Sequence, residues 1–126
     1  LNMVYTPFDG FATFVVQAAQ AVHRSDIQVV GYDGGAQNLT FIKNGQNQVA
    51  TQATPWPWCG WLQVDELNRA LHGASSAPDK VGCPPQIIDK TNLPPAGEPY
   101  TGYLNFERMF RKDWGKRYKG VTTPVF

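Results

Sequence analysis

The order of strand-like and helix-like runs along the chain limits its fold more than any other feature of the sequence. Strand character is found at residues 1–6, 27–32 and 48–53, where apolar and β-branched residues dominate. Each run is followed by a segment in which apolar residues have helical spacing. Units of this kind join parallel strands through right-handed crossovers. The sequence therefore predicts an α/β protein with a parallel, doubly wound sheet in three αβα layers.

The predicted helices should each bury the face on which their apolar residues gather. For the helix over residues 10–23, this face comprises Phe11, Phe14, Val15, Ala18, Ala19 and Val22. For the helices over residues 36–44 and 57–72, it comprises Ala36, Leu39, Ile42, Trp61, Val64, Leu67 and Leu71.

The last third of the chain is predicted to be mostly linker. Beyond Gly73 the composition shifts to Pro, Gly, Ser and Ala on both sides of a short apolar run at residues 86–89, and a final helix is expected over residues 104–114. Basic residues gather around that helix, at Arg108, Arg111, Lys112, Lys116, Arg117 and Lys119. A nucleic-acid partner would require a basic stripe across the whole domain, so this cluster is interpreted as a solvated helix face and no nucleic-acid partner is expected.

Chemistry-bearing motifs are scarce in this sequence. Cys59 and Cys83 have no metal-ligand spacing, and His23 and His72 stand alone, so neither a metal site nor a cofactor is expected. The two cysteines either pair in an oxidising compartment or remain separate thiols, and the sequence leaves both possibilities open. The nucleophile elbow, the phosphate-binding loop and the dinucleotide fingerprint are all missing. We therefore expect no catalytic residues and no enzymatic activity.

Five short motifs resemble those of type I periplasmic sugar-binding proteins. Residues 26–34 (Asp-Ile-Gln-Val-Val-Gly-Tyr-Asp-Gly) resemble the signature "disvvGfDg", and Asp9 with Ala12 resembles "ND-x-x-A". Gly45 with residues 49–51 resembles "G-x-x-x-ATvaq-x-P", residues 60–73 resemble the glycine-bounded helix that follows, and residues 89–92 resemble the hinge-crossing "t-x-x-N". These resemblances occur in order across residues 2–92.

The resemblance implies a domain organisation and a function. Residues 1–92 would be the later part of the C-terminal sugar-binding lobe, and residues 93–126 a tail whose helix packs on the first lobe. The protein would be the solute-binding component of an ABC-type sugar transport system, periplasmic or extracellular, either free or lipid-anchored, with a membrane permease as partner. The same lobe occurs in the effector-binding domains of lactose-repressor-type transcription regulators and in sensor modules, and both stay as alternatives.

Candidate ligand-binding residues lie where the predicted strands end, because ligands bind beyond the carboxyl ends of parallel strands. They are Asp33, Asp9, Phe8, Thr54, Trp56 and Trp58. Carboxylates and hydroxyls can bind the hydroxyls of a sugar or polyol, and aromatic rings can cover its C–H face.

Each candidate has a structural alternative. By resemblance, Asp33 stands at the family's ligand-binding aspartate, but it could instead cap the following helix, and Asp9 either lies in the site or caps the helix beginning at Gly10. Phe8 stands where the family often has an asparagine, and it either stacks on the sugar or belongs to the core. Thr54, where many members have a glutamine, can make only one of the two contacts of an amide.

The two tryptophans, Trp56 and Trp58, flank Pro57 and suit either a sugar face or packing between lobes. The resemblance also implies that the central strand of the lobe precedes Leu1, which would leave a strand edge and an apolar face uncovered. We therefore expect the chain to associate with the missing N-terminal portion of the same protein, with a second copy of itself by swapping, or with another surface.

Overall fold

The computed structural model describes residues 1–76, 82–95, 98–102 and 105–117, with residues 116 and 117 described by backbone alone. The chain divides into two compact units. The first comprises residues 1–54 and 85–100, and the second comprises residues 55–84 and 101–126. The first unit is discontinuous in the sequence, because residues 86–89 pair with a strand of residues 1–54. The boundary expected at residue 92 stays a prediction.

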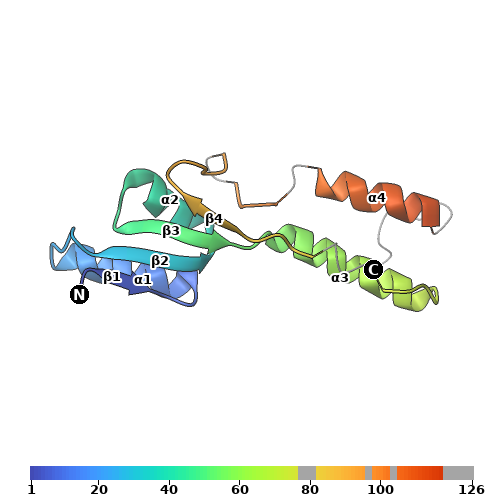
Figure 1. Cartoon of the computed structure of the whole chain (residues 1–126), viewed down its shortest axis with the longest axis horizontal. Helices are drawn as coiled ribbons and strands as arrows, with labels where there is room; N and C mark the ends of the chain where they lie inside the picture. Colours follow the sequence, from blue (N-terminus) through green and yellow to red (C-terminus); the bar gives the residue numbers. More distant parts are fainter. Residues whose placement is uncertain (77–81, 96–97, 103–104, 118–126) are drawn as a thin grey trace. The chain divides into compact units, whose positions relative to one another are not determined.

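The first unit is built on a four-stranded sheet in the order β1-β2-β3-β4 (Figure 1). Its strands are β1 (Met3–Tyr5), β2 (Gln28–Asp33), β3 (Gln48–Ala53) and β4 (Gln86–Asp89). The first three strands are parallel, as predicted, and β4 runs antiparallel to β3. The α/β class is therefore confirmed, but residues 86–89 form a strand and not part of a linker. Ile88 accounts for this, because its side chain is 1% exposed and packs with Leu39, Ile42 and Ala53.

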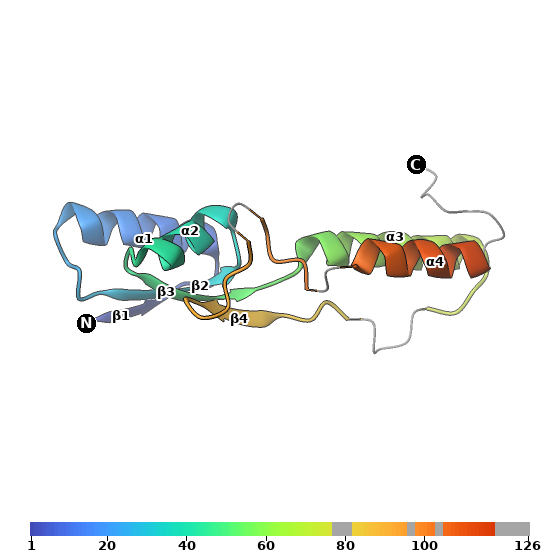
Figure 2. The same ribbon diagram turned by 90° about the horizontal axis from the view of Figure 1, so that it is seen from above.

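Two helices, α1 (Asp9–Ala21) and α2 (Ala36–Asn44), lie on the same face of this sheet (Figure 2). The reason is that β1, β2 and β3 follow one another in one direction, so successive right-handed crossovers return on one side. Among the described residues of the first unit, no helix covers the other face. The unit thus shows two of the three predicted layers.

The buried face of α1 differs from the predicted one. Ala12, Val16 and Ala19 are buried against the sheet, whereas Phe11 and Phe14 are more than half exposed. The side chains of Ala18 and Val22 are also exposed, and Val15 is half-buried. The helix has two apolar faces, and the sequence pattern predicted burial of the face with the bulkier side chains. The prediction for α2 is confirmed for Leu39 and Ile42, which are buried, but Ala36 is exposed.

The second unit contains α3 (Trp56–Leu71) and α4 (Phe106–Arg117), which pack through aromatic residues. Their buried cluster comprises Trp58, Phe106, Phe110 and Trp114, with Trp61, Leu62, Val64 and Cys83 packed against it. The tail helix thus contacts α3 inside the chain, and the expectation that it packs on another lobe stays a prediction. Leu104, the predicted first residue of that helix, and Lys119 lie outside the described residues, and the described basic residues Arg108, Arg111 and Lys112 are exposed.

The predicted buried face of α3 is wrong at its C-terminal end. Leu67 and Leu71 are exposed, and the helix instead buries Asp65 and Arg69. The two charged side chains form an ion pair of 2.6 Å between Arg69 Nε and Asp65 Oδ2, and Trp114 donates its indole N–H to Asp65 Oδ1 at 2.7 Å. The ring of Trp114 also stacks on Trp61, with centroids 5.3 Å apart. A hydrogen-bonded carboxylate thus fixes which side of α3 faces α4.

The two cysteines, whose pairing the sequence left open, form the disulfide Cys59–Cys83, with Cα atoms 5.6 Å apart. The bond closes a loop between residues separated by 24 positions in the sequence.

Candidate functional site

The carboxyl ends of the parallel strands carry most of the candidate residues of the first unit. Phe8 and Asp9 follow β1, Asp33 ends β2, and Thr54 follows β3. The backbone ties these segments together, because the Thr54 amide donates to the Asp33 carbonyl at 3.1 Å and the Thr6 amide donates to the Val30 carbonyl at 2.9 Å. The structure therefore brings the four candidates to one edge of the sheet.

Asp33 occupies a backbone conformation that is rare for an aspartate. Its φ is 114°, in the region that favours glycine, and its side chain is 9% exposed. The alternative role of Asp33, as the cap of the following helix, does not apply, because the N-cap of α2 is Gly35 and no side chain caps that helix. Burial and the nearby charge of Asp9 raise the pKa of the Asp33 carboxyl, while the Asp9 backbone amide opposes the shift. Strained residues of this kind cost about 1–3 kcal/mol and gather at functional sites.

Asp9 has a different role from either of those predicted for it. It follows the N-cap of its own helix, Phe8, and its carboxylate reaches away from α1. Its Oδ2 accepts hydrogen bonds from the amides of Gly34 and Gly35, both at 2.9 Å, and the side chain is 3% exposed. Asp9 therefore anchors the turn that follows Asp33, and its carboxylate is turned away from solvent.

A buried polar network completes the anchor. Thr51 donates to both carboxylate oxygens of Asp9 at 3.1 Å, and Gln48 Nε2 donates to Oδ1 at the same distance. Asn38 Nδ2 donates to the Asp9 carbonyl at 2.9 Å and to Gln48 Oε1 at 2.8 Å. Burial raises the pKa of the Asp9 carboxyl, and the hydrogen bonds from Gly35, Gln48, Thr51 and Gly34 oppose that shift.

Sequence reasoning missed Gln48, Thr51 and Asn38 as partners of Asp9. The available signal was the presence of polar residues at inward-facing positions, which need hydrogen-bond partners when buried. Two glycines make room for the network. A Cβ at Gly31 would overlap Asp9 Oδ1, and Gly34 has a φ of 79° and lies so near Ala53 that a Cβ would come within 2.6 Å of its methyl group.

Two half-buried hydroxyl groups and the exposed ring of Phe8 also lie at this edge of the sheet. Thr54 Oγ1 donates to the Tyr32 hydroxyl at 3.4 Å, so two hydroxyl groups lie together at the ends of β2 and β3. Phe8 is 52% exposed, belongs to none of the buried clusters of the described residues, and makes an edge contact with the ring of Phe11. Tyr32 was not among the predicted residues, although it precedes Asp33 in the signature.

The tryptophan candidates belong to the second unit. Trp56 is 57% exposed in the first turn of α3, as a ligand-contacting ring requires. Trp58 is 3% exposed and its ring contacts those of Phe106 and Phe110. The packing alternative thus describes Trp58, with its partners in α4 and not in a second lobe, and we leave this residue out of the proposed site.

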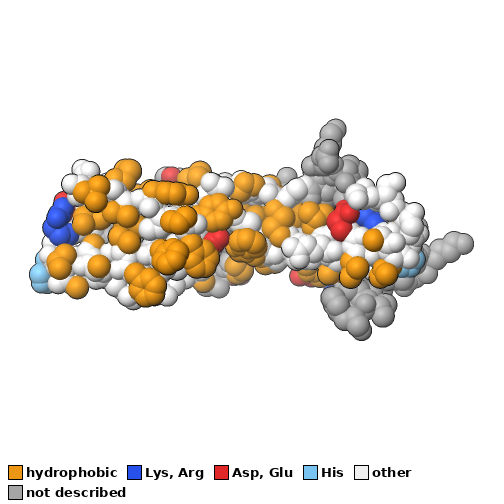
Figure 3. Space-filling view, turned by 90° about the horizontal axis from the view of Figure 1, so that it is seen from below, with side chains coloured by type: hydrophobic (Ala, Val, Ile, Leu, Met, Phe, Trp, Pro, Cys, Tyr) orange, Lys and Arg blue, Asp and Glu red, His pale blue; other side chains and the backbone are white. Residues whose placement is uncertain are grey.

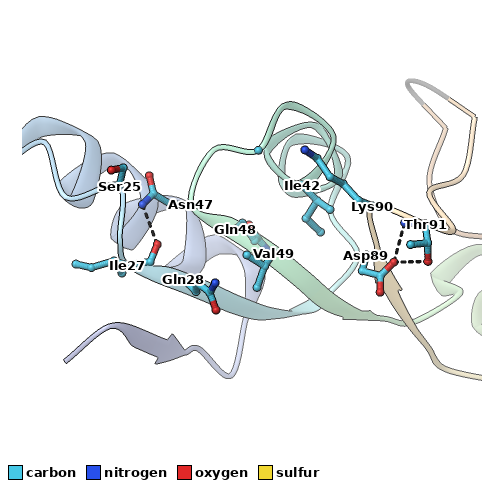
Figure 4. Close-up of a pocket in the computed structure, with 11 residues that line it drawn as sticks. Ser25, Ile27, Gln28, Ile42, Asn47, Gln48, Val49, Asp89, Lys90 and Thr91 are labelled. Carbon is cyan, nitrogen blue, oxygen red and sulfur yellow. Dashed lines mark hydrogen bonds between the residues drawn. The ribbon is translucent and has the colours of Figure 1, made fainter.

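A hollow of about 410 Å³ opens at the opposite end of the sheet, where β2 and β3 begin and β4 ends (Figure 4). Two of its polar side chains are engaged with neighbouring groups. Asn47 donates to the carbonyls of Arg24 and Ile27, and Asp89 accepts from the amide and the hydroxyl of Thr91. It lies away from the carboxyl ends of the parallel strands, which are the usual place for a ligand in such a sheet.

Comparisons with known proteins add no family to these observations, since neither a family model nor a curated protein matches the chain. Within the described residues, no group of three or more His, Cys, Asp and Glu side chains could hold a metal ion. In the same residues, no helix has the length and apolarity needed to cross a bilayer.

Proposed function

We propose that this chain binds a small sugar or polyol as part of the solute-binding component of an ABC-type sugar transport system. The proposal takes the resemblance to type I periplasmic sugar-binding proteins as its starting point, with residues 1–92 as the later part of the C-terminal lobe. One observation supports it most directly. The carboxylate of Asp33 is held at the end of β2 with a φ of 114°, at the edge of the sheet where Phe8 and Thr54 also lie.

The chemistry of the edge suits a polyhydroxylated solute. An ionised Asp33 accepts hydrogen bonds from sugar hydroxyls, and charge-assisted bonds of this kind contribute about 1.5–3 kcal/mol each. The hydroxyls of Thr54 and Tyr32 both donate and accept. The exposed ring of Phe8 can cover an apolar C–H face. These groups bind and orient a solute, and the proposed role requires no chemical step.

The disulfide supports a location outside the cytoplasm. Disulfides persist in oxidising compartments and are rare in the cytosol, so Cys59–Cys83 favours a periplasmic or extracellular protein. The same observation weighs against the effector-binding domain of a transcription regulator, which works in the cytosol. The proposed partner is accordingly a membrane permease that receives the solute.

The proposal is tested by calorimetric titration of the chain with ribose, xylose, glucose, galactose and myo-inositol. At least one should bind, and Asp33→Ala should weaken that binding by about ten- to a hundredfold. Asp26→Ala serves as control, because Asp26 is an exposed carboxylate of the same unit that pairs with Arg24. A panel without binding contradicts the proposed function, and unchanged affinity in Asp33→Ala removes Asp33 from the site.

A further inference from the structure

The turn that follows β2 contains two successive residues with positive φ. Asp33 has a φ of 114° and Gly34 has a φ of 79°. Only glycine adopts such a backbone readily, so the aspartate is held there by its surroundings. The Asp33 carbonyl accepts from the Thr54 amide at 3.1 Å, and the Gly34 amide donates to Asp9 Oδ2 at 2.9 Å. The peptide group between Asp33 and Gly34 is therefore fixed on one side by the residue after β3 and on the other by Asp9.

Asp9 and the segment around Asp33 are bonded to each other in both directions. The Asp9 carboxylate accepts from the amides of Gly34 and Gly35, which directly follow Asp33. Burial and the charge of Asp9 raise the pKa of the Asp33 carboxyl, and a hydrogen bond from the Asp9 backbone amide to that carboxyl opposes the shift. The first residue of α1 thus holds both the side chain of Asp33 and the backbone that follows it.

Asp9 itself is withdrawn from solvent. Its side chain is 3% exposed, and the partners of its carboxylate are all donors, namely the Gly34 and Gly35 amides, Thr51 and Gln48. Figure 3 shows hydrophobic side chains covering much of the first unit on one side, with little acidic surface among them. Asp9 is therefore placed to act on a solute through Asp33 and not by contact.

We propose that Asp9 is a positioning residue for solute binding, because its carboxylate holds the glycine turn in the conformation that orients Asp33 toward the solute. The inference rests on the proposed function, in which Asp33 binds a hydroxyl of a sugar or polyol. A binding group must be held within about 0.5 Å of its productive position, and buried hydrogen bonds behind it provide that support. Gln48 and Thr51 extend the support, because both donate to the Asp9 carboxylate.

The charge of Asp9 and its positioning role have opposite effects on affinity. Asp9→Asn removes a negative charge close to Asp33, which by itself favours the ionised form of Asp33 and strengthens its hydrogen bonds to hydroxyls. The same variant places an amide nitrogen among groups that are all donors, so the turn loses part of its support. Charge alone predicts tighter binding of the solute, whereas positioning predicts weaker binding.

Calorimetric titration with the solute of the panel that binds the wild-type chain tests the inference. Asp9→Asn should weaken binding about tenfold. In the Asp33→Ala background, Asp9→Asn should weaken binding no further, because its effect passes through Asp33. The control is Val16→Ala, a buried apolar position of the same helix that packs with Ala12 and Val29. It should lower the stability of the first unit and leave the affinity unchanged.

A second pair of variants uses Thr51, whose side chain is 0% exposed and donates to Asp9. Thr51→Val removes the donor while keeping the shape and should weaken binding in the same direction as Asp9→Asn. Thr51→Ser keeps the hydroxyl and should bind as the wild-type chain does. Far-UV circular dichroism checks that every variant folds, and the Thr51 pair decides the matter if Asp9→Asn does not.

The outcomes separate this inference from the proposed function. A wild-type chain that binds no solute of the panel contradicts the proposed function and this inference with it. If the wild-type chain binds and Asp9→Asn binds equally or more tightly, the inference alone is overturned. A further loss of the same size in the Asp33→Ala background overturns it as well, as does a loss in Val16→Ala that matches the loss in Asp9→Asn. For the Thr51 pair, equal affinity of the two variants has the same meaning.

Discussion

Each unit of this chain buries a carboxylate, but the two surround it differently. In the first unit, Asp9 is buried among neutral donors, which are two backbone amides, a hydroxyl and a carboxamide. In the second, Asp65 is buried against the guanidinium of Arg69 and the indole of Trp114. The first arrangement leaves a net charge under the sheet, whereas the second neutralises it. The comparison predicts that pH changes the stability of the first unit and that loss of an aromatic partner changes the stability of the second.

The two units can be followed separately. All four tryptophans, Trp56, Trp58, Trp61 and Trp114, belong to the second unit, so tryptophan fluorescence reports on that unit. The amide of Val29, which is buried in the core under α1, reports on the first unit through hydrogen exchange.

The largest effect is expected from Trp114→Ala. The indole is 0% exposed, stacks on Trp61 and donates to Asp65, so its removal leaves a cavity and an unpaired carboxylate oxygen. The free energy of unfolding of the second unit should fall by about 4 kcal/mol in a urea titration followed by fluorescence. Met109→Ala, an exposed position on the same helix, is the control and should change it little. A loss below about 1 kcal/mol for Trp114→Ala would contradict the aromatic core.

A smaller effect is expected from replacing Cys59 and Cys83 together by alanine. Their disulfide closes a loop between residues separated by 24 positions, and removing it should lower the free energy of unfolding of the second unit by about 3 kcal/mol. Fluorescence-detected urea titration without reductant measures the loss. Reductant should produce the same loss in the wild-type chain and none in the double variant. Equal stability of the two chains without reductant would show that the bond does not stabilise this unit.

The smallest effect is expected from Asp9→Asn, at about 2 kcal/mol in the first unit, because the amide nitrogen cannot accept the hydrogen bonds of the glycine turn. The measurement is hydrogen exchange at Val29. Asp26→Asn, an exposed carboxyl of the same unit, is the matched control and should have little effect.

The pH dependence sharpens this prediction. Burial raises the pKa of Asp9 above its ordinary value of 3.8, so between that value and the raised pKa the folded unit binds more protons than the unfolded one. The contribution of Asp9 to the stability of the first unit should therefore be highest below pH 3.8 and should fall as the pH rises through the raised pKa. Asp33 shifts in the same direction. Asp9→Asn should flatten the profile, and an unchanged profile would show that Asp9 does not cause it.

The sequence predicted the three parallel strands well, because β-branched runs separated by helical spacing have few other folds. For the same reason, the sequence predicted that Asp33 lies at the carboxyl end of the second parallel strand. The role of Asp9 was missed, because its partners are amides 25 and 26 residues away in the chain. The rotation of α1 was missed because both of its faces are apolar. The four-residue strand β4 was missed because it is flanked by prolines and has only one buried isoleucine, Ile88.

The disulfide also shortens the path by which β4 finds β3. β3 ends at Ala53 and β4 begins at Gln86, so in the reduced chain the two strands must meet across more than thirty residues. Once Cys59 and Cys83 are joined, the covalent path from one strand to the other runs through only the short segments outside the bond. Loop closure is less costly for short paths, and folding is faster when contacts are effectively local. Oxidation should therefore change the order of folding, so that α3 and its bond form first and the last strand then joins the sheet.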